Sequence, residues 1–131
     1  DTSNVTDMRY MFGSDESMAL TEIIFSDKFD TSNVNYMNAM FCNCSELQSL
    51  DLSGFDTSKV TKMPAMFADC DSLSTLDLKS FDTSKVTNMQ SMFAGCTSMQ
   101  EIKVSNKWVI NEGTNIAYMF NYCGVDSVTV E

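Results

Sequence analysis

The side chains of this 131-residue chain that could perform chemistry are its five cysteines and its many carboxylates. A cysteine acts as a nucleophile or a metal ligand through its thiolate, which a neighbouring base or cation usually generates. The chain contains no histidine, so it lacks the usual general base, the Ser–His and Cys–His pairs, and the commonest metal ligand. We therefore predict that the protein is not an enzyme, and we assign no catalytic residue.

Four of the cysteines recur at one position of a repeated pattern. Cys44, Cys70, Cys96 and Cys123 each follow a Met-Phe pair by the same short distance. Side chains at matching positions of a stacked array point in parallel, which favours a column of buried, reduced thiols, with disulfides or a metal site as the alternatives. Cys42, one residue from Cys44, lacks the Cys-x-x-Cys spacing of zinc sites, and we expect it to be partly exposed. We assign no metal ligand and no cofactor.

A row of aspartates also repeats, each opening an Asp-Thr-Ser triplet: Asp1, Asp30, Asp56 and Asp82. One interpretation is an Asx-turn, in which the carboxylate accepts hydrogen bonds from the N–H groups that follow it. The other is a row of Ca²⁺ sites, because Ca²⁺ prefers carboxylate and carbonyl oxygens. Nothing in the chain resembles the ligand-dense loop of calcium-binding proteins, so the pattern favours the turn.

These residues belong to an internal repeat that covers the chain. The copies read DTSNVTDMRYMF, DTSNVNYMNAMF, DTSKVTKMPAMF, DTSKVTNMQSMF and the degenerate VINEGTNIAYMF, and they begin at Asp1, Asp30, Asp56, Asp82 and Val109. A period near 26 residues is typical of leucine-rich repeats. We divide the chain into one array of repeats at about 1–29, 30–55, 56–81, 82–108 and 109–131. Because it begins within the pattern, we expect it to be a piece of a longer protein.

The spacing inside each copy predicts its secondary structure. Met-x-x-Met-Phe places apolar residues on one face of a short helix, for which Thr6, Asn35, Thr61, Thr87 and Thr114 are suitable N-caps. The alternating Leu-x-Leu that follows predicts a half-buried strand. A repeat this short must stack on its neighbours to bury its apolar residues. We therefore predict an α/β solenoid of about five right-handed coils, with a short parallel β-sheet on one face and short helices on the other.

The segments from Leu47 to Cys70 and from Leu73 to Cys96 share the phrase L-x-S/T-L-D-L-S/K-x-F-D-T-S-K-V-T-x-M-x-x-M-F-x-x-C. This phrase resembles the BspA-type leucine-rich repeat of bacterial, mycoplasma and protist surface proteins. The resemblance implies a cell-surface, extracellular protein that mediates adhesion or protein–protein recognition. A structural stalk or assembly spacer with no ligand of its own is the alternative.

The charge of the chain limits the class of partner. Its formal net charge of −10 disfavours nucleic acid, which requires a basic surface. No apolar run is long enough to span a membrane, so we expect no direct membrane insertion. The expected partner is a protein or another cell-surface macromolecule.

Two surfaces are candidates for binding that partner. The first is the outer face of the predicted sheet, and the second is a group of exposed tyrosines near the predicted helices. The face is polar and lacks the aromatic residues that often dominate interfaces, so a merely solvated surface is the competing interpretation. The candidate residues are Ser49, Asp51, Thr75, Asp77, Lys79, Glu101 and Lys103 on the sheet face, and Tyr10, Tyr36 and Tyr118 on the second surface.

Overall fold

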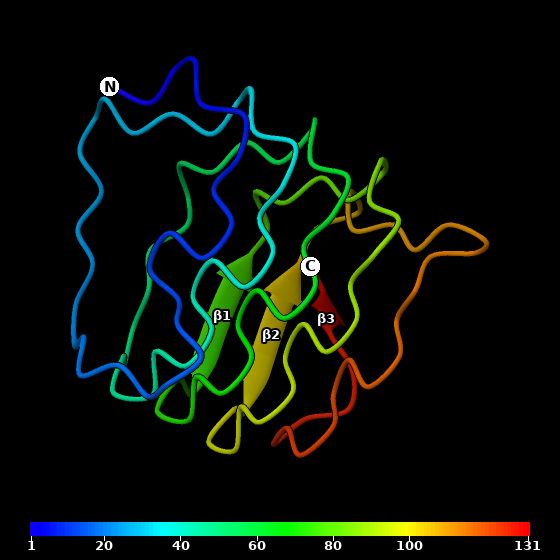
Figure 1. The fold of residues 1–131 in the computed structure, drawn as a ribbon. Coiled ribbons are helices and arrows are strands. Elements are labelled where there is room, and N and C mark those ends of the chain that lie inside the picture. Colours follow the sequence, from blue (N-terminus) through cyan, green and yellow to red (C-terminus); the bar gives the residue numbers. More distant parts are fainter.

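The computed structural model describes residues 1–131, and in it each repeat forms one coil that lies against the next. The coils follow one another in chain order, with the strands side by side on one face (Figure 1). Those strands are β1 (Thr75–Leu78), β2 (Glu101–Val104) and β3 (Thr129–Val130), which pair in parallel in the order β1-β2-β3. No helix is present, and therefore none that could cross a membrane.

The sheet is smaller than the repeat pattern predicts. In β1 the residues alternate between exposed and buried, as expected for a half-buried strand, with Leu76 and Leu78 inside. The equivalent Leu50–Leu52 of the second coil is not a strand, because its backbone forms no ladder with β1. The sheet is therefore an open, three-stranded one confined to the last three coils.

The predicted helices are wrong, and with them the predicted α/β solenoid. The Met-x-x-Met-Phe segments form consecutive tight turns, whose hydrogen bonds point in two directions. In the second coil, alternate N–H groups from Met37 to Asn43 donate to carbonyls of the third coil over 2.8 to 2.9 Å. Between them, the N–H groups of Met40 and Cys42 donate within the coil, to the Met37 carbonyl at 3.3 Å and the Ala39 carbonyl at 3.1 Å. In a helix, these N–H groups would donate to carbonyls of their own coil, and none would be left to bond the neighbouring coil.

The close spacing of the coils explains why helices do not form. The rings of Phe12, Phe41, Phe67 and Phe93 stack with centroids 5.6 to 5.8 Å apart from coil to coil. Packed helices need interaxial distances of about 8–10 Å. Helices on this face would therefore pull the phenylalanine rings out of contact, whereas flat turns keep the aromatic stack closed and let the backbones pair directly.

Each of these turns places a residue in the left-handed region of φ. In every coil the residue before Met-Phe has φ between 53° and 58°, although none is glycine: Tyr10, Ala39, Ala65, Ser91 and Tyr118. A second left-handed position follows four residues later in the last four coils, at Asn43, Asp69, Gly95 and Tyr122. Left-handed residues reverse the chain tightly enough for the turns to succeed one another.

The threonines predicted as N-caps bond across the coils instead. The N–H and hydroxyl of Thr61 both donate to the Asn35 carbonyl, and those of Thr87 both donate to the Thr61 carbonyl. Another threonine of each repeat is more deeply placed: the buried Thr57 hydroxyl donates to the Asp82 carbonyl and accepts from the Asp82 N–H, both at 2.9 Å. Thr2, Thr31 and Thr83 make the same double contact.

The Asx-turn prediction is confirmed. The carboxylates of Asp1, Asp30, Asp56 and Asp82 each accept a hydrogen bond from the N–H two residues later, at 2.8 to 3.0 Å. These bonds favour the charged form, and they lower the pKa of Asp30 and of Asp82. The repeated aspartates therefore shape the turn that opens each coil.

The apolar columns form one continuous core of 27 buried residues in the interior of the stack. The methionines lie in it as predicted, except near the N-terminus, where Met18 is half-buried and Met11 is 45% exposed. Ile116 of the last coil is equally exposed. Residues of the two end coils have a neighbouring coil on one side only, so the same sequence position buries less of its side chain there.

Candidate functional site

Ile24 is an apolar residue in a column of polar ones on the sheet face. The register of the strands defines the column in the later coils, because Asp77 pairs with Lys103 and Lys103 with Thr129. All three of these outward residues are polar or charged. Asp51 holds the position between Leu50 and Leu52, and Ile24 holds it between Ile23 and Phe25. Alternation turns Ile23 and Phe25 inward and Ile24 outward, where it is 82% exposed.

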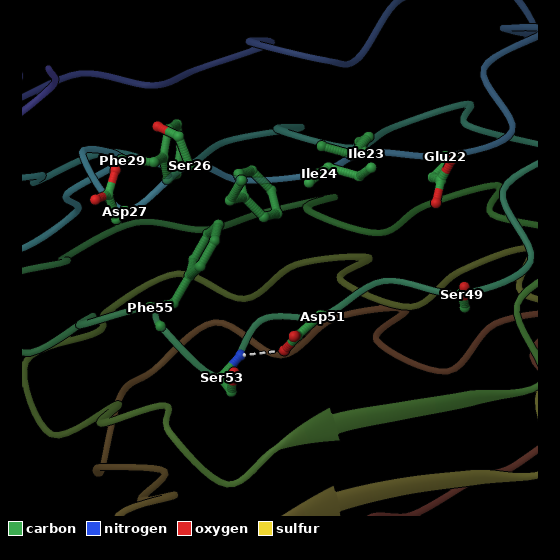
Figure 2. Close-up of a pocket in the computed structure, with 12 residues that line it drawn as sticks. Glu22, Ile23, Ile24, Ser26, Asp27, Phe29, Ser49, Asp51, Ser53 and Phe55 are labelled. Atoms are coloured by element: carbon green, nitrogen blue, oxygen red, sulfur yellow. Dashed lines mark hydrogen bonds between the residues drawn. The ribbon is translucent and has the colours of Figure 1, made fainter.

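A groove lies beside Ile24, between the first two coils. We call it the Ile24 groove, and its volume is about 430 Å³. Residues 22–27 and Phe29 of the first coil form one wall, and Ser49, Asp51 and residues 53–55 of the second coil form the other. Figure 2 shows the two walls running side by side, with Ile23 and Ile24 on one and Asp51 and Phe55 on the other. A volume of roughly 300–1,000 Å³ is usual for ligand sites in proteins.

The first coil, which forms one wall of the groove, is longer than the others. The first repeat begins at Asp1 and the second at Asp30, whereas the third and fourth begin at Asp56 and Asp82, so the first coil is 29 residues long and the second and third are 26 each. The turn after Phe25 also carries one residue more than the turn after Leu52, because Phe29 follows Phe25 by four and Phe55 follows Leu52 by three. The additional residues lie in the wall of the groove, but length is not its whole cause, because the second and third coils are equal in length and do not pair on this face either.

The backbones of both walls are unpaired. None of the hydrogen bonds in the structure involves a main-chain group of Ala19–Phe25 or of Gln48–Asp51. The edge of β1 that faces the second coil also makes no ladder, and a second, smaller groove of about 250 Å³ separates Asp51 from Asp77. On the sheet face, backbones of neighbouring coils are therefore hydrogen-bonded from β1 to β3 and are not hydrogen-bonded over the first two coils.

The charge on the two halves of this face differs. Three carboxylates line the Ile24 groove, from Glu22, Asp27 and Asp51, and no lysine or arginine does. Asp51 accepts a hydrogen bond from the Ser53 N–H at 3.0 Å, which lowers the pKa of its carboxyl. The groove therefore presents uncompensated negative charge at neutral pH.

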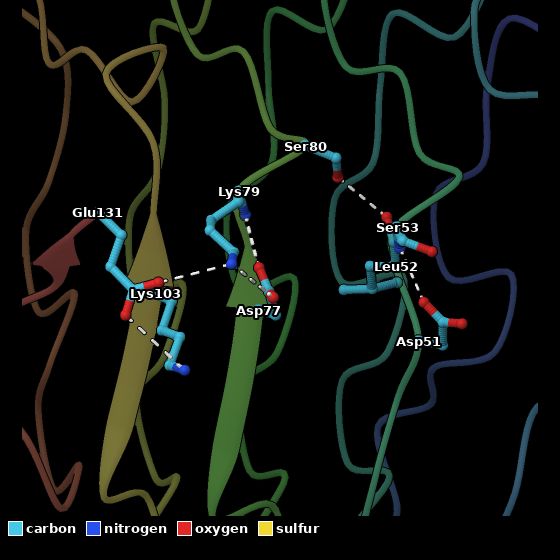
Figure 3. Close-up of polar contacts among 8 residues, drawn as sticks. All are labelled: Asp51, Leu52, Ser53, Asp77, Lys79, Ser80, Lys103 and Glu131. Carbon is cyan, nitrogen blue, oxygen red and sulfur yellow. Dashed lines mark hydrogen bonds and ion pairs between the residues drawn. The ribbon is translucent and has the colours of Figure 1, made fainter.

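The other half of the face neutralises its own charges. Lys79 lies 3.5 Å from both Asp77 and Glu131, and Lys103 lies 3.8 Å from Glu131. Figure 3 shows these four side chains joined across β1 and β2, while Asp51 contacts only its own turn. Exposed ion pairs of this kind add little stability, about 0–1 kcal/mol. Their effect is to leave the groove as the electronegative end of the face.

The structure separates the residues predicted on the sheet face. All seven lie on the outer face as expected, but only Ser49 and Asp51 line the Ile24 groove. Asp77, Lys79 and Lys103 belong to the ion-paired cluster, with Glu131 as an additional member. The remaining two, Thr75 and Glu101, stand opposite each other at the start of β1 and β2.

The structure divides the predicted tyrosine surface. Tyr10 and Tyr36 are exposed in the first two coils, where the Arg9 guanidinium lies 5.5 Å from the centre of the Tyr36 ring and pairs with Asp7 at 2.6 Å. Tyr118 belongs to the last coil, four coils from Tyr10 and three from Tyr36, which corresponds to roughly 15–20 Å at the spacing of paired backbones. The tyrosines therefore do not form one patch.

Glu22, Ile23, Ile24, Phe25 and Asp27 are the residues of the groove that sequence reasoning missed. The available signal was the run Ile23-Ile24-Phe25, three consecutive apolar residues where the other coils alternate. A run that breaks an in–out pattern must expose one apolar side chain, and here that side chain is Ile24. Tyr122, 82% exposed in the last coil, was also missed.

The thiols are placed for packing. Cys44, Cys70 and Cys96 are free and buried, and each donates a hydrogen bond to a phenylalanine carbonyl of the preceding coil at 3.0 to 3.3 Å. Burial raises the pKa of Cys44 to about 11 and of Cys96 to about 12, so both remain protonated at neutral pH. The predicted buried thiol column is confirmed for these three, whereas Cys123 is half-buried and Cys42 partly exposed.

No three carboxylates or thiols approach one another closely enough to hold a metal ion. The sequence matches the family described as Mycoplasma protein of unknown function, DUF285, over residues 1–23 and again over residues 6–128. The chain belongs to this family. Comparison of this DUF285 chain with curated proteins and with solved structures gives no match. A chain of the DUF285 family thus folds into stacked tight turns with a short, open parallel sheet on one face.

Proposed function

We propose that this DUF285 chain is a non-catalytic recognition module of a cell-surface protein, which mediates adhesion or protein–protein contact. The resemblance of the repeat phrase to BspA-type surface proteins supports an extracellular location and a protein partner. The matching family is a mycoplasma family of unknown function, which agrees with that resemblance in the group of organisms. The net charge of −10 keeps such a surface soluble and unattractive to nucleic acid.

The observation that carries the proposal is the Ile24 groove. A protein surface that serves only as a spacer gains nothing from an isoleucine that is 82% exposed beside unpaired backbone and unneutralised carboxylates. Such a combination of apolar contact, free hydrogen-bonding groups and charge is what a partner protein can use. The protonated, buried thiols of Cys44 and Cys96 support the non-catalytic part of the proposal, because the thiolate is the reactive form.

An adhesion assay tests the proposal. Microspheres coated with residues 1–131 are applied to cultured epithelial cells and to a panel of immobilised extracellular-matrix proteins, and the attached spheres are counted. Control spheres carry an unrelated folded protein of similar net charge. We expect the coated spheres to attach in excess of the control on at least one surface.

Equal attachment of the two kinds of sphere, with circular dichroism showing a folded chain, would contradict the proposal. In that case the alternative gains support, namely a stalk or assembly spacer whose coils merely provide length. Self-association of the chain end to end, measured by sedimentation velocity, would strengthen that alternative further.

A further inference from the structure

The Ile24 groove has the features of a site for an extended polypeptide. Main-chain groups of Ala19–Phe25 and Gln48–Asp51 are free on its two walls, whereas the later coils pair along this face from β1 to β3. An extended segment satisfies such groups by adding a strand, as peptide-binding domains with open sheet edges do. A compact ligand cannot satisfy a row of them.

The apolar residues of the groove determine which kind of partner side chain can pack inside it. The ring centroids of Phe25 and Phe55 lie 5.2 Å apart in an edge-on arrangement, and Phe29 continues the aromatic surface at 4.6 Å from Phe25. Ile24 adds an exposed aliphatic side chain on one wall. An aliphatic or aromatic side chain of the partner would cover Ile24 and contact the edge of this aromatic cluster.

The charges define the flanking residues of the segment. Glu22 and Asp27 lie toward opposite ends of the first wall, and Asp51 projects from the opposite wall between them (Figure 2). Because no cation lines the groove, a partner that brings Lys or Arg gains the attraction of three carboxylates. An acidic segment would meet repulsion along the whole length.

We propose that the Ile24 groove binds an extended segment of a partner protein in which an apolar residue is flanked by lysine or arginine on alternate positions. This inference rests on the proposed function and adds the chemical class of the partner. The segment pairs with the free backbone of the walls, covers Ile24, and places its cations beside Glu22, Asp27 and Asp51.

Gly54 offers a way to block the groove without disturbing the core. It lines the groove, its φ is not in the left-handed region, and a Cβ added there meets nothing within 4 Å. Gly54→Leu therefore fills the groove while the fold stays intact. Asn106→Leu is the matched control, since Asn106 is an exposed turn residue after β2 and lies outside the groove.

The probe is a pair of fluorescent peptide pools of about nine residues, long enough to hold a strand of about five to six residues with its flanking residues. In one pool an apolar residue is flanked by lysines on alternate positions, and in the other the lysines are replaced by glutamates. Fluorescence anisotropy with residues 1–131 should show binding of the lysine pool only. Gly54→Leu should weaken it at least about tenfold and Asn106→Leu should not, while folding is monitored by circular dichroism.

Charge variants and amide exchange test the two remaining parts of the inference. The triple variant Glu22→Gln, Asp27→Asn and Asp51→Asn should weaken binding by about threefold to a hundredfold, the range for three exposed pairs, and added salt should reduce the difference. Bound peptide should slow hydrogen exchange at the amides of Thr21–Phe25 and Ser49–Asp51. Unchanged exchange at these amides would show that side chains alone hold the peptide, and would refute strand addition.

The other outcomes also decide the matter. Equal binding of the glutamate pool, or equal binding to the Gly54→Leu variant, would overturn the inference. So would dimerisation of the chain that Gly54→Leu abolishes, because the occupant would then be a second copy. If coated spheres adhere to cells but still do so with Gly54→Leu, the proposed function stands and the groove is not its site.

Discussion

Replacing Ala65 by glycine should stabilise this protein, although the same replacement in a helix would destabilise it. Ala65 lies in the Met-x-x-Met-Phe segment of the third coil with φ of 54°. An L-residue pays about 1–2 kcal/mol to occupy the left-handed region, and glycine does not. The sign of the change in unfolding free energy therefore reports directly on the turn that takes the place of the predicted helix.

The magnitude follows from two opposing contributions. Glycine relieves about 1–2 kcal/mol of strain, but it costs about 0.4–1 kcal/mol because the unfolded chain gains freedom. Ala65 is half-buried, so loss of its methyl group removes a further few tenths of a kcal/mol. The net expectation is a stabilisation of about 0.5 kcal/mol. In a helix interior the same substitution would cost about 1 kcal/mol.

Urea denaturation followed by circular dichroism measures the difference. Ala68→Gly is the matched control, because Ala68 lies in the same coil, is buried, and does not have a positive φ. It should lose about 1–2 kcal/mol through backbone freedom and the missing methyl group. If Ala65→Gly destabilises the protein as much as Ala68→Gly does, the left-handed turns are refuted.

Three further predictions concern a threonine contact between coils, an aspartate hydrogen bond within a turn, and the buried thiols. Thr57→Val should lower the free energy of unfolding by about 2–3 kcal/mol, because it leaves the Asp82 N–H and carbonyl without the hydroxyl that each contacts at 2.9 Å. The control Thr97→Val, at an exposed site, should change the free energy of unfolding by less than about 0.5 kcal/mol. Equal losses in the two variants would contradict the threonine contact. The turn bond lowers the pKa of Asp82 in the folded chain, so its contribution to stability is fully present above the ordinary value of 3.8 and disappears as pH falls through the lowered value. The free energies of unfolding of wild type and of an Asp82→Ala variant should therefore differ above pH 4, and the difference should shrink as the pH falls below 4. A difference that does not change with pH would refute the contribution. Cys70 and Cys96 should react with a thiol reagent at pH 8 only as fast as the chain unfolds, because burial raises the pKa of both, and rapid labelling of all five cysteines would show that the thiol column is open.

The sequence was informative about which residues are buried and how each coil begins. The methionine, valine and phenylalanine columns lie in the core, and the Asp-Thr-Ser triplets make the expected turns. Both predictions depend on comparing copies, and every copy repeats the same physical environment. A single copy would have carried neither.

The helices could not be excluded by the spacing of apolar residues, because tight turns and helices can bury the same positions. Two features did point away from helices. Asn43, Asp69 and Gly95 occupy one column, and these are the residue types that tolerate the left-handed region. The second feature, the close spacing of the coils, depends on how the rings stack and becomes visible only in three dimensions.

The candidate site was predicted only in part for a related reason. Ser49 and Asp51 were recognised as outward residues, but the other wall of the groove belongs to the first coil, whose extra length the periodic pattern treats as an irregularity. Where the extra residues go is a matter of packing. Ile24 could have been noticed because it breaks the alternation, and no spacing rule predicts the depth of the space beside it.

Every backbone hydrogen bond between coils joins immediate neighbours, which has a mechanical consequence for a chain under tension. Pulling on its two ends loads the contacts of one terminal coil at a time, because no main-chain bond ties distant coils together. The chain should then lengthen in successive steps of about 90 Å, the contour length of 26 residues at roughly 3.5 Å each. A tether built this way unfolds one coil at a time under load, and each coil can refold onto its neighbour when the load falls. Single-molecule force spectroscopy would record a regular series of unfolding peaks in place of one abrupt rupture.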